Sequence, residues 1–160
     1  MDKNADGFSL IELLIVVAII LIIAAIAIPN FLRSRISANQ ASAVASLRTF
    51  DTAEISYSST YNTGYTVDIA YLAPPPPGAG STSTAAGLID SVLASGVKSG
   101  YNFIYSPGAS DSTGRINTYG IIAAPISSST GTNYYFTDQS GVIRQNSTTT
   151  AGSTDSPLAG

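Results

Sequence analysis

The residue with the clearest chemical potential in this sequence is Glu12, the one charged residue in the apolar stretch 8–28. A carboxylate is costly in an apolar environment, so it is expected to bind a proton or to find a cation. An ionisable residue inside a membrane-spanning segment marks a functional position by default, with a partner to be identified. We therefore expect Glu12 to act through such a partner.

The stretch that carries Glu12 is long enough to cross a bilayer, which takes about 20 apolar residues in a helix. Residues 13–28 are apolar on every side and do not form an ordinary amphipathic surface helix. A secretory signal has small residues at a cleavage site after its apolar run, whereas here the small residue Gly7 precedes the run. The sequence therefore predicts that any removed segment is the leader, residues 1–7, and that the apolar helix stays.

The segment GFSLIELLIVVAII, residues 7–20, resembles the N-terminal signature of type IV prepilins. Type IV pilins share this signature with the pseudopilins of type II secretion. The resemblance implies that a prepilin peptidase cuts between Gly7 and Phe8 and then methylates the new amino terminus of Phe8. It also implies that Glu12 meets the amino terminus of a neighbouring subunit during filament assembly, and that the helix breaks or loosens at Pro29.

Two features depart from the family pattern. The leader has two aspartates, Asp2 and Asp6, against the one cation Lys3, whereas family leaders tend to be basic. The chain has no cysteine, although many pilins close their carboxy-terminal loop with a disulfide. Packing and subunit contacts are expected to take the place of that bond.

The cation that Glu12 meets has two candidate sources. Cleavage would free the amine of Phe8, and methylation keeps that nitrogen protonatable, so a neighbouring helix could supply it. Within one chain the same amine lies about one turn from Glu12, so an intramolecular contact competes. We favour the intermolecular pair, which would set the register of the filament more than its stability.

Downstream of Pro29, apolar residues from Ile36 to Tyr57 recur at helical spacing. The composition of residues 38–53 is rich in alanine, which favours a helix. The pattern predicts one nearly continuous helix from Phe8 to about Ser58, roughly 75 Å long.

The spacing of apolar residues predicts a short helix at residues 88–93. Beyond it, apolar side chains recur at every second residue, which is typical of β-strands. The expected strands are 101–105, 117–124, 133–137 and 142–145, joined by tight turns as in an antiparallel meander. The predicted fold is therefore α+β and pilin-like. The hydrophobic half of the long helix protrudes, and the amphipathic half packs on a roughly four-stranded antiparallel sheet.

The expected organisation has four parts: the leader, residues 1–7; the apolar helix, residues 8–29; the amphipathic helix, residues 30–60; and a globular head, residues 61–160. Within the head, residues 74–77 are four prolines, which we interpret as a stiff surface connector rather than a recognition ligand. The Ser/Thr-rich tail from residue 146 is expected to lie along the surface or to be loose.

Composition argues against an enzyme. The chain of 160 residues has no histidine and no cysteine, so the usual zinc ligands and nucleophile pairs are missing. Charged residues make up 11% of the chain and the net charge is -3, with no basic stretch for nucleic acid. We expect no cofactor and no metal. Asp111 and Asp138 are weak candidates for a calcium site, and aspartates in turns are normally structural.

Three interpretations remain: a type IV pilus subunit, a major pseudopilin of a type II secretion system, and a non-assembling single-pass protein with a prepilin-like signal. The neutral, Ser/Thr-rich head favours the pilin. The resemblance then implies a homo-oligomeric helical filament, a prepilin peptidase, inner-membrane assembly machinery and membrane lipid as partners. It places the chain in the bacterial inner membrane before assembly and in an extracellular pilus afterwards, serving adhesion, motility or DNA uptake.

Overall fold

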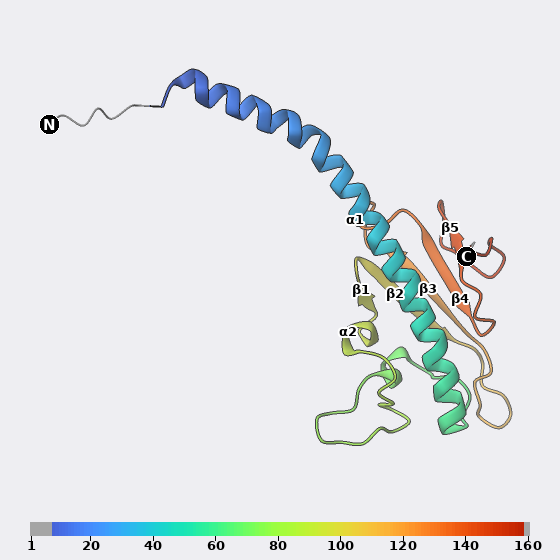
Figure 1. Cartoon of the computed structure of the whole chain (residues 1–160). Coiled ribbons are helices and arrows are strands. Elements are labelled where there is room, and N and C mark those ends of the chain that lie inside the picture. Colours follow the sequence, from blue (N-terminus) through green and yellow to red (C-terminus); the bar gives the residue numbers. More distant parts are fainter. Residues whose placement is uncertain (1–7, 159–160) are drawn as a thin grey trace. The chain divides into compact units, whose positions relative to one another are not determined.

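The computed structural model describes residues 8–158 and divides the chain into two compact units, Met1–Arg35 and Ile36–Gly160. We call the second unit the head. A single helix, α1 (Leu10–Tyr61), contributes residues to both (Figure 1). It ends three residues later than expected. The following residue, Asn62, has a φ of 56°, the left-handed conformation that commonly terminates helices.

The sheet of the head has five strands, whereas the sequence predicts roughly four. The strands are β1 (Val97–Lys98), β2 (Tyr101–Pro107), β3 (Tyr119–Pro125), β4 (Tyr134–Asp138) and β5 (Arg144–Asn146). Each strand is antiparallel to the next in chain order, which confirms the meander. The missed strand, β1, is too short for an alternating pattern. Positive φ angles at Ser99 and Gly100 form the tight turn that pairs it with β2.

Two short helices lie between α1 and the sheet: η1 (Ile69–Leu72) and α2 (Ser91–Ala94). The second begins later than the expected residue 88 because Asp90 caps it, accepting a hydrogen bond from the Leu93 amide at 2.8 Å. Ahead of this cap, the amides of Leu88 and Ile89 donate to the carbonyl of Leu72. Leu88 and Ile89 are therefore apolar because they pack on the core, and they are not part of the helix.

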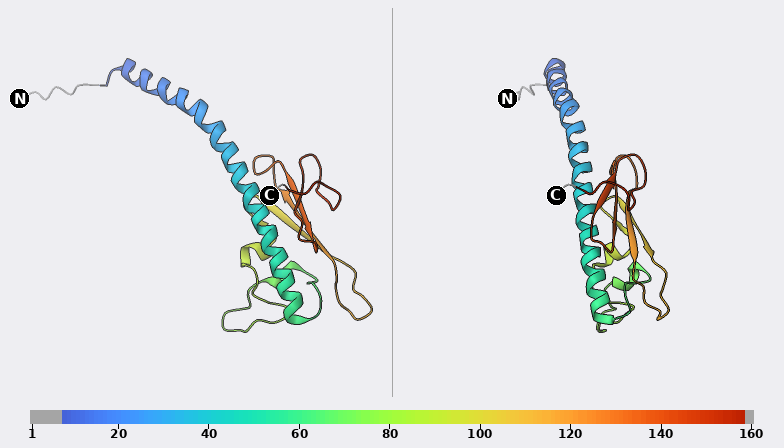
Figure 2. Two further views of the ribbon diagram at one scale, coloured as in Figure 1. Left: turned by 45° about the vertical axis from the view of Figure 1, so that its right-hand side comes forward. Right: turned by 90° about the vertical axis from the view of Figure 1, so that its right-hand side faces the viewer.

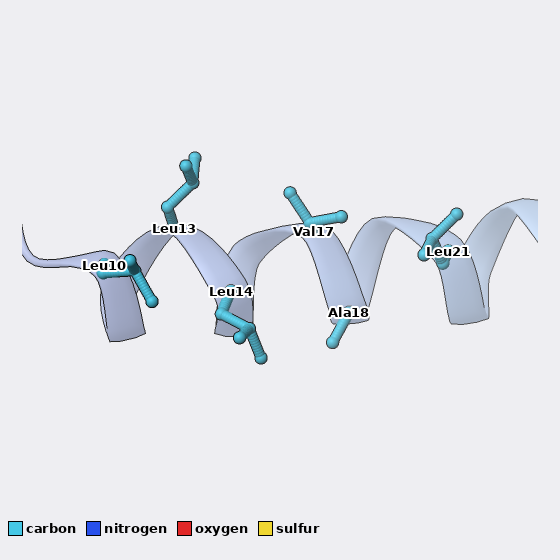
Figure 3. A pocket seen from close by; sticks show the side chains of 6 residues that line it. All are labelled: Leu10, Leu13, Leu14, Val17, Ala18 and Leu21. Carbon is cyan, nitrogen blue, oxygen red and sulfur yellow. The ribbon is translucent and has the colours of Figure 1, made fainter.

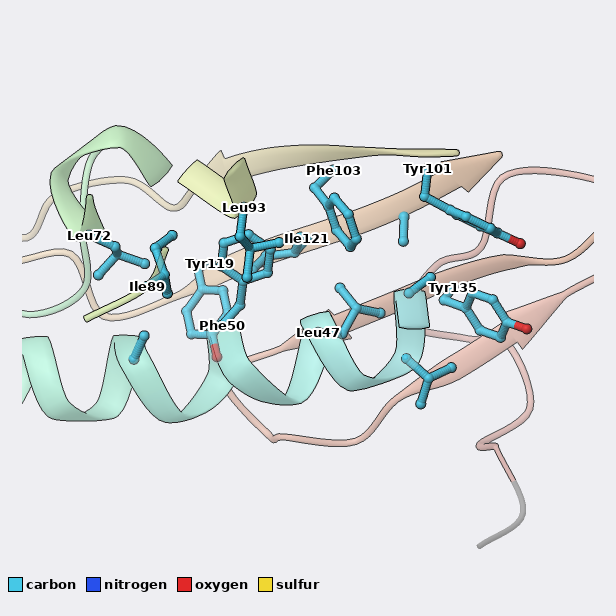
Figure 4. Close-up of a cluster of buried hydrophobic side chains, with 14 of the residues drawn as sticks. Leu47, Phe50, Leu72, Ile89, Leu93, Tyr101, Phe103, Tyr119, Ile121 and Tyr135 are labelled. Atoms are coloured by element: carbon cyan, nitrogen blue, oxygen red, sulfur yellow. The ribbon is translucent and has the colours of Figure 1, made fainter. Parts of the chain in front are cut away.

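One face of the sheet packs against the part of α1 that belongs to the head (Figure 2). Leu47 and Phe50 of α1 are fully buried, and they meet β2 and β3 in the core shown in Figure 4. The rings of Phe50 and Phe103 lie 5.5 Å apart. The expectation that an amphipathic helix would cover an antiparallel sheet is confirmed.

Two carboxylates of α1 also face the sheet. Asp51 accepts hydrogen bonds from the hydroxyls of Tyr119 and Thr137, both at 2.9 Å. Glu54 is fully buried and accepts one from the amide of Thr66 at 2.9 Å. Neither carboxylate forms a salt bridge within residues 8–158. Burial raises the pKa of both groups, and the hydrogen bonds they accept offset only part of that rise.

The carboxy-terminal segment is attached to the sheet. The amide of Gln145 donates to the carbonyl of Ser156 at 3.1 Å, and the amide of Leu158 donates to the carbonyl of Ile143 at 2.8 Å. Ala151 is buried, and Leu158 packs on the core. Residues 156–158 therefore cover the outer edge of β5 and protect it from pairing with another strand.

Replacing Phe50 by Ala should lower the free energy of unfolding of the head by about 3–5 kcal/mol, because it opens a cavity between α1 and β2. Ile55 is a matched control on the same helix, since its side chain is 58% exposed. Ile55→Ala should change that free energy by about 0.5 kcal/mol or less. Urea denaturation of the full chain in detergent measures both, and equal losses would contradict the packing described here.

The buried carboxylates predict a specific pH dependence. The ordinary pKa values are 3.8 for Asp51 and 4.5 for Glu54, and both are raised in the folded head. As pH rises from about 4, the unfolded chain loses these protons first, so this contribution to stability falls until pH passes the raised values. Other acids add their own pH dependence, so the comparison is with Glu54→Gln, which keeps an acceptor for the Thr66 amide.

The free energy of unfolding of the wild type relative to Glu54→Gln should therefore fall as pH rises, by up to about 1.4 kcal/mol for each unit by which the Glu54 pKa is raised. Denaturation curves at a series of pH values test this. A difference that stays constant or grows in the opposite direction would show that Glu54 is not held in an environment that disfavours its charge.

Candidate processing and assembly site

The residues that the sequence singled out lie at the start of α1. Gly7 lies outside the described residues, so the structure does not describe the expected cleavage bond. Phe8 precedes the helix and is 75% exposed. Ser9 follows it, and its carbonyl accepts the first helical hydrogen bond, from the Leu13 amide at 3.2 Å.

Glu12 closes the first turn of this helix. Its Oε2 accepts a hydrogen bond from the backbone amide of Ser9 at 3.0 Å. Ser9 and Glu12 occupy the first and last positions of a capping box, S-x-x-E, in which the glutamate satisfies an amide that the helix itself leaves without an acceptor. The negative charge also lies at the end of the helix that favours it. This role was missed in the sequence, although the spacing itself is the signal.

The contact bears on the two expected partners of Glu12. Within the chain, Glu12 contacts the backbone amide of Ser9. The intramolecular contact that the sequence suggests is instead one between Glu12 and the amine of Phe8. In the uncleaved chain the nitrogen of Phe8 is a peptide nitrogen without charge, so an ion pair requires cleavage first. The second carboxylate oxygen makes no hydrogen bond within residues 8–158. Pairing with a neighbouring amine stays a prediction.

The surface around Glu12 is apolar. Figure 3 shows six side chains, from Leu10 to Leu21, that stand out from the ribbon and line an open hollow. The most apolar part of α1 has a mean hydropathy of 3.3, and none of it is buried within the chain. Water alone does not favour such a surface, so it needs lipid or other protein against it.

Pro29 lies inside α1, and the helix continues through it. Proline has no amide hydrogen, so the carbonyl of Ala25 loses its usual partner at this turn. A break or loosening of the helix at Pro29 stays a prediction for the assembled state.

The weaker candidates have local structural roles. Asp111 accepts hydrogen bonds from the hydroxyl of Thr113, the amide of Arg115, the side chain of Asn117 and the amide of Thr113, and these hold its pKa well below the usual range. Asp138 accepts one from the Ser140 amide in its own turn. Within residues 8–158, no group of three or more His, Cys, Asp or Glu side chains is placed to hold a metal ion.

Comparison with known proteins agrees with this geometry. Residues 2–28 match the family described as the prokaryotic N-terminal methylation motif, so this segment carries that motif. The chain is 65% identical over 37 residues, 23% of its length, to the type IV wide pilus major component PilA4 of Thermus thermophilus. It is 53% identical over 51 residues, 32% of its length, to the type IV major pilin protein PilA of Myxococcus xanthus.

These matches cover 28% and 23% of the two relatives. No solved structure matches the chain significantly. The motif and the relatives confirm the resemblance seen in the sequence, and the long helix on an antiparallel sheet is a pilin-like α+β fold.

Glu12 variants can separate the helix cap from the charge. Glu12→Gln keeps an oxygen acceptor for the Ser9 amide, whereas Glu12→Ala removes it. Hydrogen exchange of the Ser9 amide, measured on the uncleaved chain in detergent, should stay close to wild type in the first variant. It should speed up by about five- to tenfold in the second, equivalent to about 1 kcal/mol. Equal exchange in all three proteins would contradict the capping contact.

Proposed function

We propose that this chain is the structural subunit of a type IV pilus. It is inserted into the inner membrane as a prepilin, cleaved after Gly7 and N-methylated at Phe8. It then polymerises into a helical filament. The observation that carries this proposal is an apolar helical surface with one carboxylate at its start, left uncovered by the chain itself.

The apolar segment suits two environments in turn. Before assembly it is long enough to span the hydrocarbon core as a single helix, with lipid against its side chains. After assembly the same side chains would pack against copies of the segment in the filament core. In both states the apolar surface is removed from water, so transfer between them carries little hydrophobic cost.

Glu12 would favour assembly only after the leader has been cleaved. Cleavage creates a cation at Phe8 where the precursor has a neutral peptide group. The second oxygen of Glu12 in one subunit can then pair with the Phe8 amine of the next subunit and set their relative position along the axis. Removal of the leader is thus the chemical step that makes the chain competent to assemble.

The matched relatives favour a pilus over a pseudopilus, since both are named as major components of type IV pili. The proposed partners are other copies of the chain, a prepilin peptidase, the inner-membrane assembly machinery and membrane lipid. The proposed locations are the inner membrane before assembly and the cell surface afterwards. The proposal assigns the chain no catalytic role and no cofactor.

Mass spectrometry of filaments sheared from cells should find a chain that begins with N-methylated Phe8. Electron microscopy should show surface filaments for the wild type and none for Glu12→Gln or Glu12→Ala, while both variants still accumulate in the inner membrane. Because Glu12→Gln keeps the helix cap, its failure to assemble would isolate the charge. Filaments of normal length from that variant, or mature protein that still begins at Met1, would refute the proposal.

A further inference from the structure

A buried carboxyl group on α1 holds the chain segment that follows this helix. Glu54 and Thr66 are both fully buried. The backbone amide of Thr66 donates to Oε2 of Glu54 at 2.9 Å, and the Thr66 hydroxyl lies 2.5 Å from Oε1. Thr66 is thus bound to the helix through two of its atoms. The role of the apolar helix does not account for this contact.

The contacts of Thr66 continue to the sheet. Its hydroxyl also lies 3.2 Å from the hydroxyl of Tyr105 on β2, and the Tyr105 hydroxyl donates to the Thr66 carbonyl at 2.8 Å. Three oxygen–oxygen contacts therefore join Glu54, Thr66 and Tyr105. Each contact needs one proton, whereas the two hydroxyls supply only two. A proton on Glu54 completes the set, because the carboxyl then donates to the Thr66 hydroxyl and the Thr66 hydroxyl donates to Tyr105.

Asp51, one turn earlier on α1, provides a contrast. It accepts hydrogen bonds from the hydroxyls of Tyr119 and Thr137, and each hydroxyl brings its own proton. These contacts are complete with an ionised carboxylate. The geometry therefore calls for an added proton at Glu54 and for none at Asp51.

The surroundings of Glu54 favour its neutral form. Within residues 8–158 it forms no salt bridge, and the guanidinium of Arg115 donates to Asn62 instead. Burial raises the pKa of Glu54, the hydrogen bonds from Thr66 oppose part of that rise, and the charge of Asp51 adds to it. The titratable groups that face Glu54 are all acids: Asp51 and Tyr57 of α1, Tyr105 of β2 and Tyr119 of β3, with Asp68 near Tyr105.

The segment that Thr66 anchors has little else inside the fold. We call residues 63–68 the latch segment, and Thr66 has its one fully buried side chain. Val67 is exposed. The backbone of Thr63 and Tyr65 is joined to Ile116 by two hydrogen bonds, of 3.3 and 2.8 Å. A segment with so few buried contacts opens locally at a lower free energy than the core does.

We propose that Glu54 is a proton-operated latch, whose protonated carboxyl holds Thr66 and whose ionisation releases the latch segment from α1. Ionisation removes the proton that completes the three contacts and places a second negative charge one turn from Asp51. Opening of the segment lets water reach that charge, which offsets the cost of burying it. The head therefore loosens at this end as pH rises. The inference concerns the head alone and does not depend on filament assembly.

The chain has two glutamates, Glu12 and Glu54, so the proton can be observed directly. Isotope labelling of the glutamate carboxyl carbons gives two signals in NMR of the full chain in detergent. Glu54→Gln removes one of them and so assigns both. In a pH series, the Glu54 signal should change at a pH above the ordinary pKa of 4.5. A change at or below that value would overturn the inference.

Amide hydrogen exchange of Thr66 measures the release. At each pH the wild type is compared with Glu54→Gln, whose side-chain amide can donate to the Thr66 hydroxyl and whose oxygen can accept from the Thr66 amide. This variant imitates the protonated carboxyl at every pH. The two rates should agree at low pH, and the wild-type rate should exceed the other by about tenfold or more once Glu54 has ionised, since one pKa unit is a factor of ten.

The amide of Leu47, in the core part of α1, is the control for global unfolding. It should exchange alike in the wild type and in Glu54→Gln throughout the pH series. Equal acceleration at Leu47 and Thr66 would show that the whole head opens and would overturn the latch. So would a Thr66 rate that stays equal to that of Glu54→Gln while the Glu54 signal titrates.

Thr66→Ser and Thr66→Val separate the hydroxyl from the packing of this side chain. The serine keeps the hydroxyl and should keep the pH dependence. The valine has a similar shape but no hydroxyl, so the amide at this position should exchange faster than in the serine variant at low pH. Equal exchange in the two variants would refute the role of the hydroxyl network. None of these results bears on filament formation, because the chain is unassembled.

Discussion

The uncovered apolar surface of residues 8–28 is the constraint on which the rest of this protein depends. A soluble domain buries such side chains in its own core, whereas here the core is built entirely from residue 43 onward. The apolar side chains of residues 8–28 therefore take no part in that core. Because lipid and a bundle of identical helices are both apolar, one sequence can serve in each without a change of fold.

The single carboxylate in that surface would have a different partner at each stage of the proposed assembly. In the uncleaved chain Glu12 caps its own helix through the Ser9 amide, a contact that uses one of its two carboxylate oxygens. In the proposed filament the other oxygen would meet a new amino terminus. A residue that is already ordered by its helix loses little conformational freedom when it pairs, so the cap would favour the proposed pairing.

The head uses buried polar contacts as well as packing. Asp51 and Glu54 lie one turn apart on α1 and bind different parts of the head, the strands β3 and β4 in one case and the segment after α1 in the other. Such contacts specify how the helix sits on the sheet, while burial of the charges opposes the gain in stability. At the far edge, Arg144 and Gln145 of β5 donate hydrogen bonds to the carbonyls of Asp155 and Ser156, and these hold the carboxy-terminal segment on the sheet.

The sequence alone determined the features that depend on local pattern. The prepilin-like segment, the amphipathic stretch that follows it and the alternation at Tyr101, Phe103 and Tyr105 are each readable within a few turns of chain. The meander also followed, because short strands joined by tight turns have few other ways to pair. The capping contact between Ser9 and Glu12 is equally local, because its S-x-x-E spacing lies within one helical turn.

Only the tertiary structure decided the features that join distant residues. β1 is two residues long and exists because β2 lies beside it. Buried Glu54 accepts a hydrogen bond from Thr66, and buried Asp51 accepts one from Thr137. The periodicity of α1 gives no sign of either partner. The tail from residue 146 has a composition typical of a loose segment, yet Asp155 accepts a hydrogen bond from Asn146 of β5 and Leu158 donates one to the carbonyl of Ile143. Pairing across the fold creates these sites, so their residues carry no local signature.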